Sequence, residues 1–405
     1  MTEPDPLVTM VVGGVVAAFA FGFLAHRLKL SPIIGYLAAG VVITHYAPGV
    51  AVDFDLASEL AQFGVILIMF GMGLKFSPGK LIECRWIALP CALGQMTVVV
   101  LLGLGFGWLL GLSSIEALIL GFSFSIASTV VLLRTLDVND LAEVAVGRLA
   151  TCWLLVQDLT AVFVVVLMPV LAQHGDGAVG GTSVLHAIAS KALELVLFTI
   201  IMIVIARRLL PGLLVFIAKA RSRELFSLGV FAIGLGIAFA AEKLFGMNFA
   251  LGAFVAGLVL NESELSHRAA EDLTPFRDAF AVLFFVSVGM LFDVQLLLAQ
   301  SWTILTILAV IIIGNGGAAF LMMAVMRVPL EQRLTVAGGL AQIGEFSFLI
   351  SGFALSLGLL SDDTQALVTA GILISIVLNP LVRQALQLAA RLIQAERSAD
   401  FTQRA

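Results

Sequence analysis

Long apolar segments follow one another along almost the whole of this sequence. A helix that crosses a lipid bilayer needs about 20 mostly apolar residues, and the chain contains about thirteen such runs. Their approximate spans are 7–25, 32–47, 57–74, 86–110, 114–134, 147–172, 186–209, 224–244, 248–262, 276–294, 302–326, 333–357 and 363–390. Only 12% of the 405 residues are charged, against about 25% in soluble chains. A soluble core could not hide this much apolar surface, so the sequence predicts an all-α protein that spans a lipid bilayer.

Basic residues indicate how the chain is oriented in the bilayer. With the N-terminus outside, the cytoplasmic segments contain every one of the 22 Lys and Arg except Lys191 and Lys243. Lys and Arg are strongly enriched on the cytoplasmic side of membrane proteins. The acidic flank at residues 1–6 argues against a cleaved signal peptide. We therefore expect a multi-pass protein with its N-terminus outside and its C-terminus in the cytoplasm.

Two short patterns recur at nearly the same distance along the chain. Gly35, Ala39 and Gly40 recur 217 residues later as Gly252, Ala256 and Gly257, and Gly73, Phe76 and Trp86 recur 216 residues later as Gly289, Phe292 and Trp302. The repeated units begin at the second and ninth predicted spans, an odd number apart, so they have opposite orientations in the bilayer. Inverted repeats of this kind place a transporter's substrate site near the midplane, commonly at broken helices.

Two stretches rich in small and hydroxylated residues fall at mid-membrane depth in the fifth and twelfth spans. The repeat offset aligns residues 123–133 with residues 338–350. The polar and small positions that they bring into correspondence are Ser125, Ser128, Thr129, Gln342, Gly344, Glu345 and Ser347. Such runs let a membrane helix unwind and leave backbone carbonyls free to coordinate a cation. Small residues also serve close packing between membrane helices, so both interpretations stay open for these stretches alone.

Asp158 lies in the middle of the sixth span, with roughly ten apolar-dominated residues on each side. An ionised carboxylate at that depth is costly unless it meets water, a cation or a proton. One buried group that binds either a proton or a cation, with alternating access to the two sides, would exchange the two. Helix capping or interhelical bonding is the structural alternative. Gln157 beside it offers a neutral amide to a cation or to a neighbouring helix. Glu345 is a second deep acid, which either binds the ion or satisfies the freed amides of the unwound stretch.

Other classes of function find little support in the sequence. No His, Cys or Asp cluster has metal-ligand spacing and no nucleophile–base set is visible, so we expect no enzyme and no metal beyond a transported monovalent cation. A net charge of -5 gives no indication of a nucleic-acid partner. Sodium-coupled uptake of an organic anion should need basic or hydroxyl groups for the anion near residues 123–133 and 338–350, and no mid-membrane Lys or Arg is present there.

Four motifs, in order along the chain, match one known family. They are GFSFSIASTVVLLRTL at 121–136, VQDLTAV at 156–162, the long charged-to-apolar segment at 260–292 and LAQIGEFSFLI at 340–350. Together they resemble the monovalent cation:proton antiporter-2 family, in its Kef-type potassium-efflux branch. The resemblance covers essentially the whole chain.

The resemblance implies a sodium/proton-antiporter-like fold in which two broken helices cross. It implies a transmembrane domain at 1–394, with dimerisation spans 1–3 and 7–10 and core spans 4–6 and 11–13, and a cytoplasmic tail at 395–405. A homodimer in a bacterial inner membrane is expected. Asp158 would carry the cation and the proton, with Gln157, Ser125 and Thr129 beside it and with Ser128, Gln342, Gly344 and Glu345 supporting them from the crossing helices.

A charged connector at Glu264, His267, Glu271 and Asp272 resembles the loop that contacts a nucleotide-binding regulatory domain in Kef-type exporters. Read from its residues alone, it is an amphipathic connector. No glycine fingerprint follows the last span, so we expect no cofactor in this chain, whereas a regulatory domain or ancillary subunit outside it would bind a nucleotide.

Asn315 departs from the family pattern, because many relatives place a lysine in the middle of the eleventh span. A neutral amide neither holds nor releases a proton, which leaves the charge transported per cycle open. The function we expect is exchange of a monovalent cation, potassium before sodium, for protons by alternating access around Asp158. The alternative is a gated cation channel of the same fold with weak proton coupling.

Overall fold

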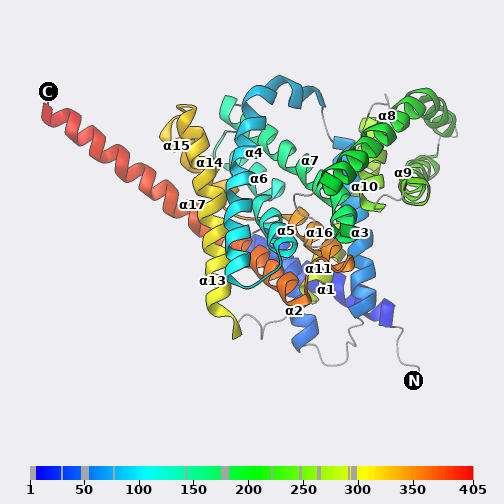
Figure 1. Ribbon diagram of the computed structural model, residues 1–405, viewed down its shortest axis with the longest axis horizontal. Coiled ribbons are helices and arrows are strands. Elements are labelled where there is room, and N and C mark those ends of the chain that lie inside the picture. Colours follow the sequence, from blue (N-terminus) through cyan, green and yellow to red (C-terminus); the bar gives the residue numbers. More distant parts are fainter. Residues whose placement is uncertain are drawn as a thin grey trace. The chain divides into compact units, whose positions relative to one another are not determined.

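The computed structural model describes residues 6–28, 31–46, 54–75, 78–141, 144–174, 182–219, 222–245, 249–261, 266–290, 292 and 299–404. All regular structure in these ranges is helical (Figure 1). In chain order the helices are α1 (Pro6–Arg27), α2 (Pro32–Tyr46), α3 (Phe54–Lys75), α4 (Pro78–Leu109), α5 (Ser114–Ser125), α6 (Thr129–Val138), α7 (Ala145–His174), α8 (Thr182–Lys219), α9 (Arg223–Phe245), α10 (Phe249–Asn261), α11 (Ser266–Met290), α13 (Ser301–Ala309), the π-helical turn η2 (Val310–Asn315), α14 (Gly316–Val325), α15 (Leu330–Leu340), α16 (Glu345–Ser356) and α17 (Asp362–Arg404).

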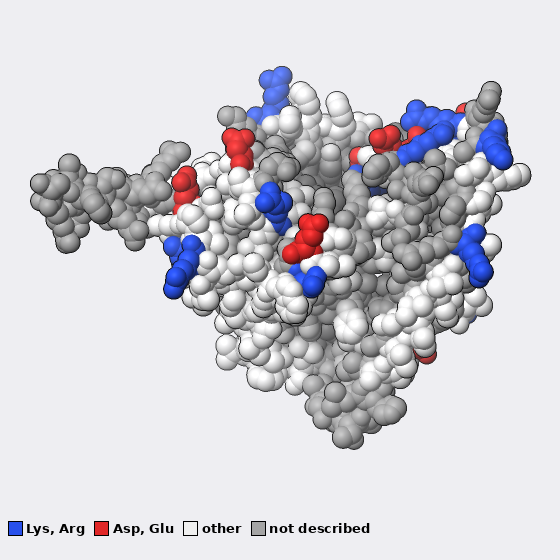
Figure 2. Space-filling model, turned by 90° about the horizontal axis from the view of Figure 1, so that it is seen from above, with Lys and Arg blue, Asp and Glu red and all other residues white. Residues whose placement is uncertain are grey.

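Each of the thirteen predicted spans corresponds to a helix or to a divided helix. The fifth span is divided into α5 and α6, the eleventh into α13, η2 and α14, and the twelfth into α15 and α16. Within the described residues, seven helices are long and apolar enough to cross a membrane, and five shorter apolar helices accompany them. Figure 2 shows that most of the described surface on the face in view carries neither acid nor base. The prediction of an all-α membrane protein is confirmed.

The chain divides into two compact units, which we describe separately. Unit 1 contains Met1–Ser77, Val165–His174 and Gly180–Phe292, and unit 2 contains Pro78–Val164, Gly175–Val179 and Asp293–Ala405. The roles of dimerisation domain and mobile core that the family resemblance implies stay predictions for these groups of helices.

Unit 1 builds the same helix crossing twice, at the repeated glycines. Gly40 of α2 lies against Gly289 of α11, where a Cβ on Gly289 would come within 3.1 Å of the Gly40 Cα. Gly257 of α10 lies against Gly73 of α3, where a Cβ on either glycine would come within 2.9 Å of the other's Cα. The repeat maps Gly40 onto Gly257 and Gly73 onto Gly289. The two crossings are therefore equivalent, as the predicted inverted repeat requires.

Unit 2 repeats a different pattern, in which a long helix, a broken helix and another long helix follow one another. The first copy runs from α4 through the α5–α6 pair to α7, and the second from α13–η2–α14 through the α15–α16 pair to α17. A buried apolar cluster around Trp153 of α7 includes Ala319 and Met323 of α14 and Leu340 of α15. This packing positions the ends of α15 and the middle of α7, where the polar residues of the sequence prediction lie.

The prediction of a connector loop up to Asp272 is wrong for its second half. Helix α11 begins at Ser266, so His267, Glu271 and Asp272 belong to its first turns. The physical reason is an apolar face, because Ala269 and Leu273, four residues apart, are both buried. Glu264 and the side chain of His267 lie outside the described residues.

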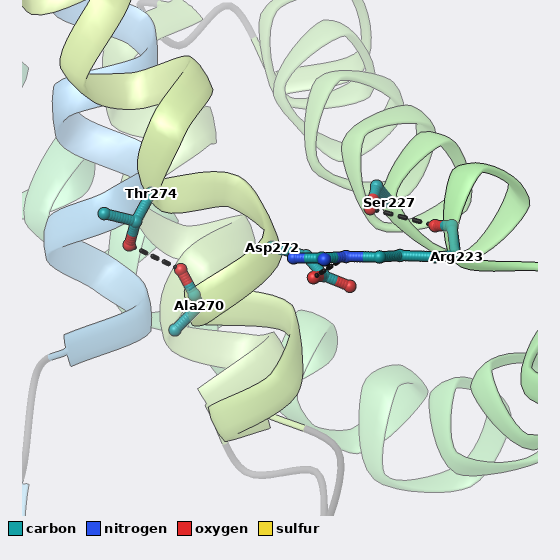
Figure 3. A network of polar contacts seen from close by, with 5 residues as sticks. All are labelled: Arg223, Ser227, Ala270, Asp272 and Thr274. Atoms are coloured by element: carbon teal, nitrogen blue, oxygen red, sulfur yellow. Dashed lines mark hydrogen bonds and ion pairs between the residues drawn. The ribbon is translucent and has the colours of Figure 1, made fainter.

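Asp272 is buried on α11 and is held by a residue of α9. Arg223 Nε donates a hydrogen bond to Asp272 Oδ1 over 2.9 Å, and the two side chains are 78% and 7% exposed, respectively. Figure 3 shows the guanidinium reaching across from the start of α9 to α11. Two elements that are separated in the sequence are therefore connected at this end of unit 1. Glu271, by contrast, is exposed.

Candidate ion-binding site

Asp158 lies near the middle of α7 and is only 4% exposed. Thr129, the first residue of α6, donates a hydrogen bond from Oγ1 to Asp158 Oδ2 over 3.4 Å. The structure therefore brings together two residues that the sequence singled out, from two different helices of unit 2. The contact places the Asp158 carboxylate at the N-terminal end of α6, where the positive end of that helix dipole lies.

The first helix break, at residues 126–128, separates α5 from α6. Ile126 has extended backbone angles (φ -106°, ψ 112°), so the helical hydrogen bonds end there. Side chains from three other helices take over the freed groups. Asn315 Nδ2 donates to Phe124 O over 2.7 Å, Gln95 Nε2 donates to Ser125 O over 3.1 Å, and Gln157 Oε1 accepts from Ala127 N over 3.1 Å.

Gln95 of α4 connects these side chains to one another. Its Nε2 also donates to Asn315 Oδ1 over 2.6 Å, while its Oε1 accepts from Gln157 Nε2 over 2.5 Å and from Trp153 Nε1 over 3.3 Å. Gln95 is fully buried. Gln95 is not among the residues predicted from the sequence. Its single amide in an otherwise apolar membrane span is nevertheless a usable signal, because such amides usually bond across helices.

The second helix break, at residues 341–344, separates α15 from α16 and meets the first break directly. Gly344 N donates to Ile126 O over 3.0 Å, and Ser347 Oγ donates to Ser123 O over 2.5 Å. A side chain at Gly344 would not fit, since its Cβ would lie 2.6 Å from the Ser128 Cα. The two breaks therefore cross in contact, as expected from the family resemblance.

Both breaks are held in the same way by the long helix that follows them. In the first repeat Gln157 of α7 accepts from Ala127 N, and in the second Ser375 Oγ of α17 accepts from Ile343 N over 3.4 Å. The repeat offset relates Ala127 to Ile343. Only the first copy, however, carries an acid next to the holding side chain, which is Asp158. The two copies therefore share the holding contact but differ in the acid, and Asp158 of α7 lies against Thr129 of α6.

The remaining predicted residues have structural contacts of their own. Ser125 Oγ donates to Phe122 O over 2.8 Å, and Ser128 Oγ accepts from Val131 N over 3.4 Å in the first turn of α6. Gln342 Nε2 donates to Ser128 O and to Gly339 O. Glu345 is the first residue of α16, but its side chain lies outside the described residues. The amide of Gln157 is engaged by Ala127 and Gln95, so it holds the helix break.

The helix ends at the crossing have complementary electrostatic character. α5 and α15 end at the two breaks and present their carbonyl ends, which favour a cation, whereas α6 and α16 begin there and present their amide ends, which favour a carboxylate. Broken helices in transporters use both kinds of end to bind ions and substrates. Next to Asp158 this arrangement provides what is needed to bind either a cation or a proton.

Comparison with known proteins agrees with this chemistry. The family model "Sodium/hydrogen exchanger, transmembrane" matches residues 14–386. YbaL of Escherichia coli K12, assigned as a cation/proton antiporter, is 46% identical over 94% of this chain and 69% of its own length. The glutathione-regulated potassium-efflux protein KefC of the same organism is 30% identical over 89% of this chain and 57% of its own length. A potassium-efflux protein of Haemophilus influenzae is 30% identical over 92% and 59%.

A solved structure supports the fold. The sodium proton antiporter MjNhaP1 of Methanocaldococcus jannaschii aligns with a TM-score of 0.65 over 94% of this chain and 97% of its own, at 16% identity. The chain spans just over half the length of the potassium-efflux relatives and about two thirds of YbaL. The chain therefore belongs to the sodium/hydrogen exchanger family and, within it, to the Kef-type branch of cation/proton antiporters: it is a membrane transporter and not an enzyme.

Proposed function

We propose that this chain exchanges a monovalent cation, with potassium the first candidate, for protons across a bacterial inner membrane, and that Asp158 binds the two in turn. The observation that supports this role is the burial of Asp158 in mid-helix, with Thr129 directed at it from the start of α6. An acid placed in a membrane span is by default a functional residue.

The exchange follows from competition for one carboxylate. When a proton neutralises Asp158, the charge that attracts the cation disappears, and when a cation is bound, protonation is disfavoured. Alternating exposure of the same group to the two sides then moves the two ions in opposite directions. The crossing supplies the neutral oxygen ligands and helix ends, and Gln95, Gln157 and Asn315 keep the freed backbone groups bonded while the break stays open.

The test is cation-driven proton movement in proteoliposomes that contain a pH-sensitive dye. Asp158→Asn keeps the size and hydrogen-bonding capacity of the side chain but cannot ionise, so it is expected to abolish exchange while the protein still purifies as a folded species. Asp363→Asn, at an exposed acid in the first turn of α17, is the matched control and should retain exchange. Normal exchange by Asp158→Asn would contradict the proposal that Asp158 binds the cation and the proton.

The choice of potassium rests on the relatives, several of which carry potassium efflux in their names. The same assay run with potassium, sodium, rubidium and lithium decides it. Half-saturation at the lowest concentration for potassium supports the proposal, and preference for sodium or lithium contradicts this part of it.

The orientation, assembly and regulation of the chain belong to the proposal as well. We propose an outside N-terminus, a cytoplasmic C-terminus and a homodimer, with a nucleotide-binding regulatory domain or ancillary subunit acting at the start of α11. Exposed Glu271 next to the anchored Asp272 supports that docking place.

Impermeant thiol labelling of cysteines introduced at each terminus tests the orientation, and mass determination in detergent tests the dimer. A photo-crosslinker at position 271 that captures no such domain would contradict the docking place.

A further inference from the structure

The side chain of Gln342, in the second helix break, is fully buried and has a fixed orientation. Its Nε2 donates to two backbone carbonyls, Ser128 O over 3.3 Å and Gly339 O over 3.2 Å. Carbonyl oxygens only accept hydrogen bonds, so turning the amide over would place Oε1 against two acceptors. The nitrogen is therefore committed to the carbonyls, and the oxygen points elsewhere.

That oxygen has no hydrogen-bond partner among the described residues. Buried polar atoms are almost always satisfied, because an unmade bond costs about 1–3 kcal/mol. The other amides of the crossing follow this rule: Gln95 and Gln157 each use both ends of the side chain within the protein. Gln342 differs from them, since one end fixes the break and the other offers an acceptor with no protein donor among the residues described.

A short chain of contacts connects Gln342 to Asp158. The carbonyl of Ser128 that holds Nε2 belongs to the peptide unit joining Ser128 to Thr129, and Thr129 Oγ1 contacts Asp158 Oδ2. Gly344 allows this approach, because any Cβ there would press against the backbone of Ser128. One peptide unit therefore separates the amide of the second repeat from the threonine beside the acid of the first.

We propose that Gln342 Oε1 is a ligand of the transported cation, an inference that rests on the proposed exchange at Asp158. Neutral carbonyl-type oxygens replace the hydration shell of monovalent cations in selective sites. An amide oxygen of this kind binds a cation but does not take up a proton at neutral pH. Gln342 thus binds the cation but not the proton, whereas Asp158 binds either of them. The second repeat, which lacks an acid at the position corresponding to Asp158, contributes a neutral ligand in its place.

The test is the half-saturating potassium concentration of Gln342→Met in proteoliposomes at fixed pH. Methionine keeps the length and burial of the side chain but removes the oxygen ligand, so half-saturation should rise by about tenfold or more. The maximal rate at saturating potassium should stay within about threefold, because Asp158 still carries the charge. Potassium-dependent protection against thermal unfolding in detergent should need correspondingly more potassium.

Asn379→Leu is the matched control. Asn379 Nδ2 of α17 donates to Gly338 O over 2.7 Å, and Gly338 precedes Gly339, whose carbonyl accepts from Gln342. This variant therefore also removes a side-chain amide that bonds to the last turn of α15. It should lower stability without moving half-saturation. Gln342→Asn, which keeps the amide but withdraws the oxygen, should lie between wild type and Gln342→Met and should change the order of preference among the four cations.

A lower maximal rate of Gln342→Met with unchanged half-saturation would overturn the proposal, because it would show that Gln342 only supports the break or holds a water molecule. If Gln342→Met does not purify as a folded protein, Gln342→Asn decides the matter: unchanged half-saturation and selectivity would overturn it. Exchange that survives in Asp158→Asn would instead remove the proposed function itself, so the two failures are distinguishable.

Discussion

At the scale of single residues, Gln95 has the largest set of partners at the first helix break. Its substitution by leucine would leave Ser125 O, Gln157 Nε2 and Trp153 Nε1 without their partner. Each buried unsatisfied group costs about 1–3 kcal/mol, so Gln95→Leu should lower the free energy of unfolding by about 2–4 kcal/mol after some relaxation. Thermal or denaturant unfolding in detergent measures this loss.

Thr97→Val is the control on the same helix. Thr97 is exposed, and within the described part of the chain its hydroxyl donates one hydrogen bond, to Leu93 O one turn earlier, over 2.7 Å. This change should alter stability by less than about 0.5 kcal/mol. Equal losses in Gln95→Leu and Thr97→Val would mean that the buried amide network does not hold the break.

Asn315 permits a prediction about the charge moved in each cycle. It is buried in η2 and holds Phe124 O with its nitrogen while its oxygen accepts from Gln95. Asn315→Lys introduces a positive charge that competes with the cation for the same acid, and it also removes the acceptor for Gln95. We expect altered voltage dependence of exchange under a clamped membrane potential, together with lower stability. Unchanged voltage dependence would show that this position does not set the coupling.

The residues of the site differ in how far their roles could be predicted from the sequence. Asp158 was predictable because the cost of burying a charge marks it in any apolar span. The role of Gln95 and the orientation of the Gln342 amide were not predictable, because they depend on partners more than 200 residues away, such as Asn315 and Ser128. The sequence left open whether the Gln157 amide serves a cation or a neighbouring helix, and in the structure Ala127 and Gln95 both bond to it.

At the scale of secondary-structure elements, the contact between the two breaks depends on Gly344. An added Cβ would lie 2.6 Å from the Ser128 Cα, so Gly344→Ala must push the breaks apart. Exchange should fall by about tenfold or more, since small displacements at a site reduce its activity sharply. Gly352→Ala in α16 should exchange normally, because the nearest described atom to an added Cβ there is Gln365 Nε2, at 3.9 Å. Equal activity of the two variants in the dye assay would contradict the close crossing.

The elements were predictable to different extents. Apolar length gave the thirteen spans, and small polar runs gave both breaks, because these signals are local in the sequence. The π-helical turn at 310–315 was not predicted, since VIIIGN reads as an ordinary helix and the extra residue is accommodated through tertiary contacts. The early start of α11 was missed because its charged residues outnumber the buried Ala269 and Leu273 that fix it.

At the scale of the whole molecule, the repeat agrees with our proposal that a single acid serves two ions. The scaffold builds two broken helices and two holding contacts, from Gln157 and Ser375, but an acid directly follows the holding residue only in the first copy, where Asp158 follows Gln157. Exchange by one carboxylate requires that proton and cation exclude each other, and this exclusion is the central claim about Asp158.

The most direct test is the half-saturating potassium concentration of the wild-type chain, measured in proteoliposomes at several pH values. Mass action at one shared site predicts that, in the range where Asp158 is mostly protonated, half-saturation rises about tenfold for each unit by which the pH falls. A half-saturating concentration that does not change with pH would show that proton and cation bind to different groups, and would contradict the account.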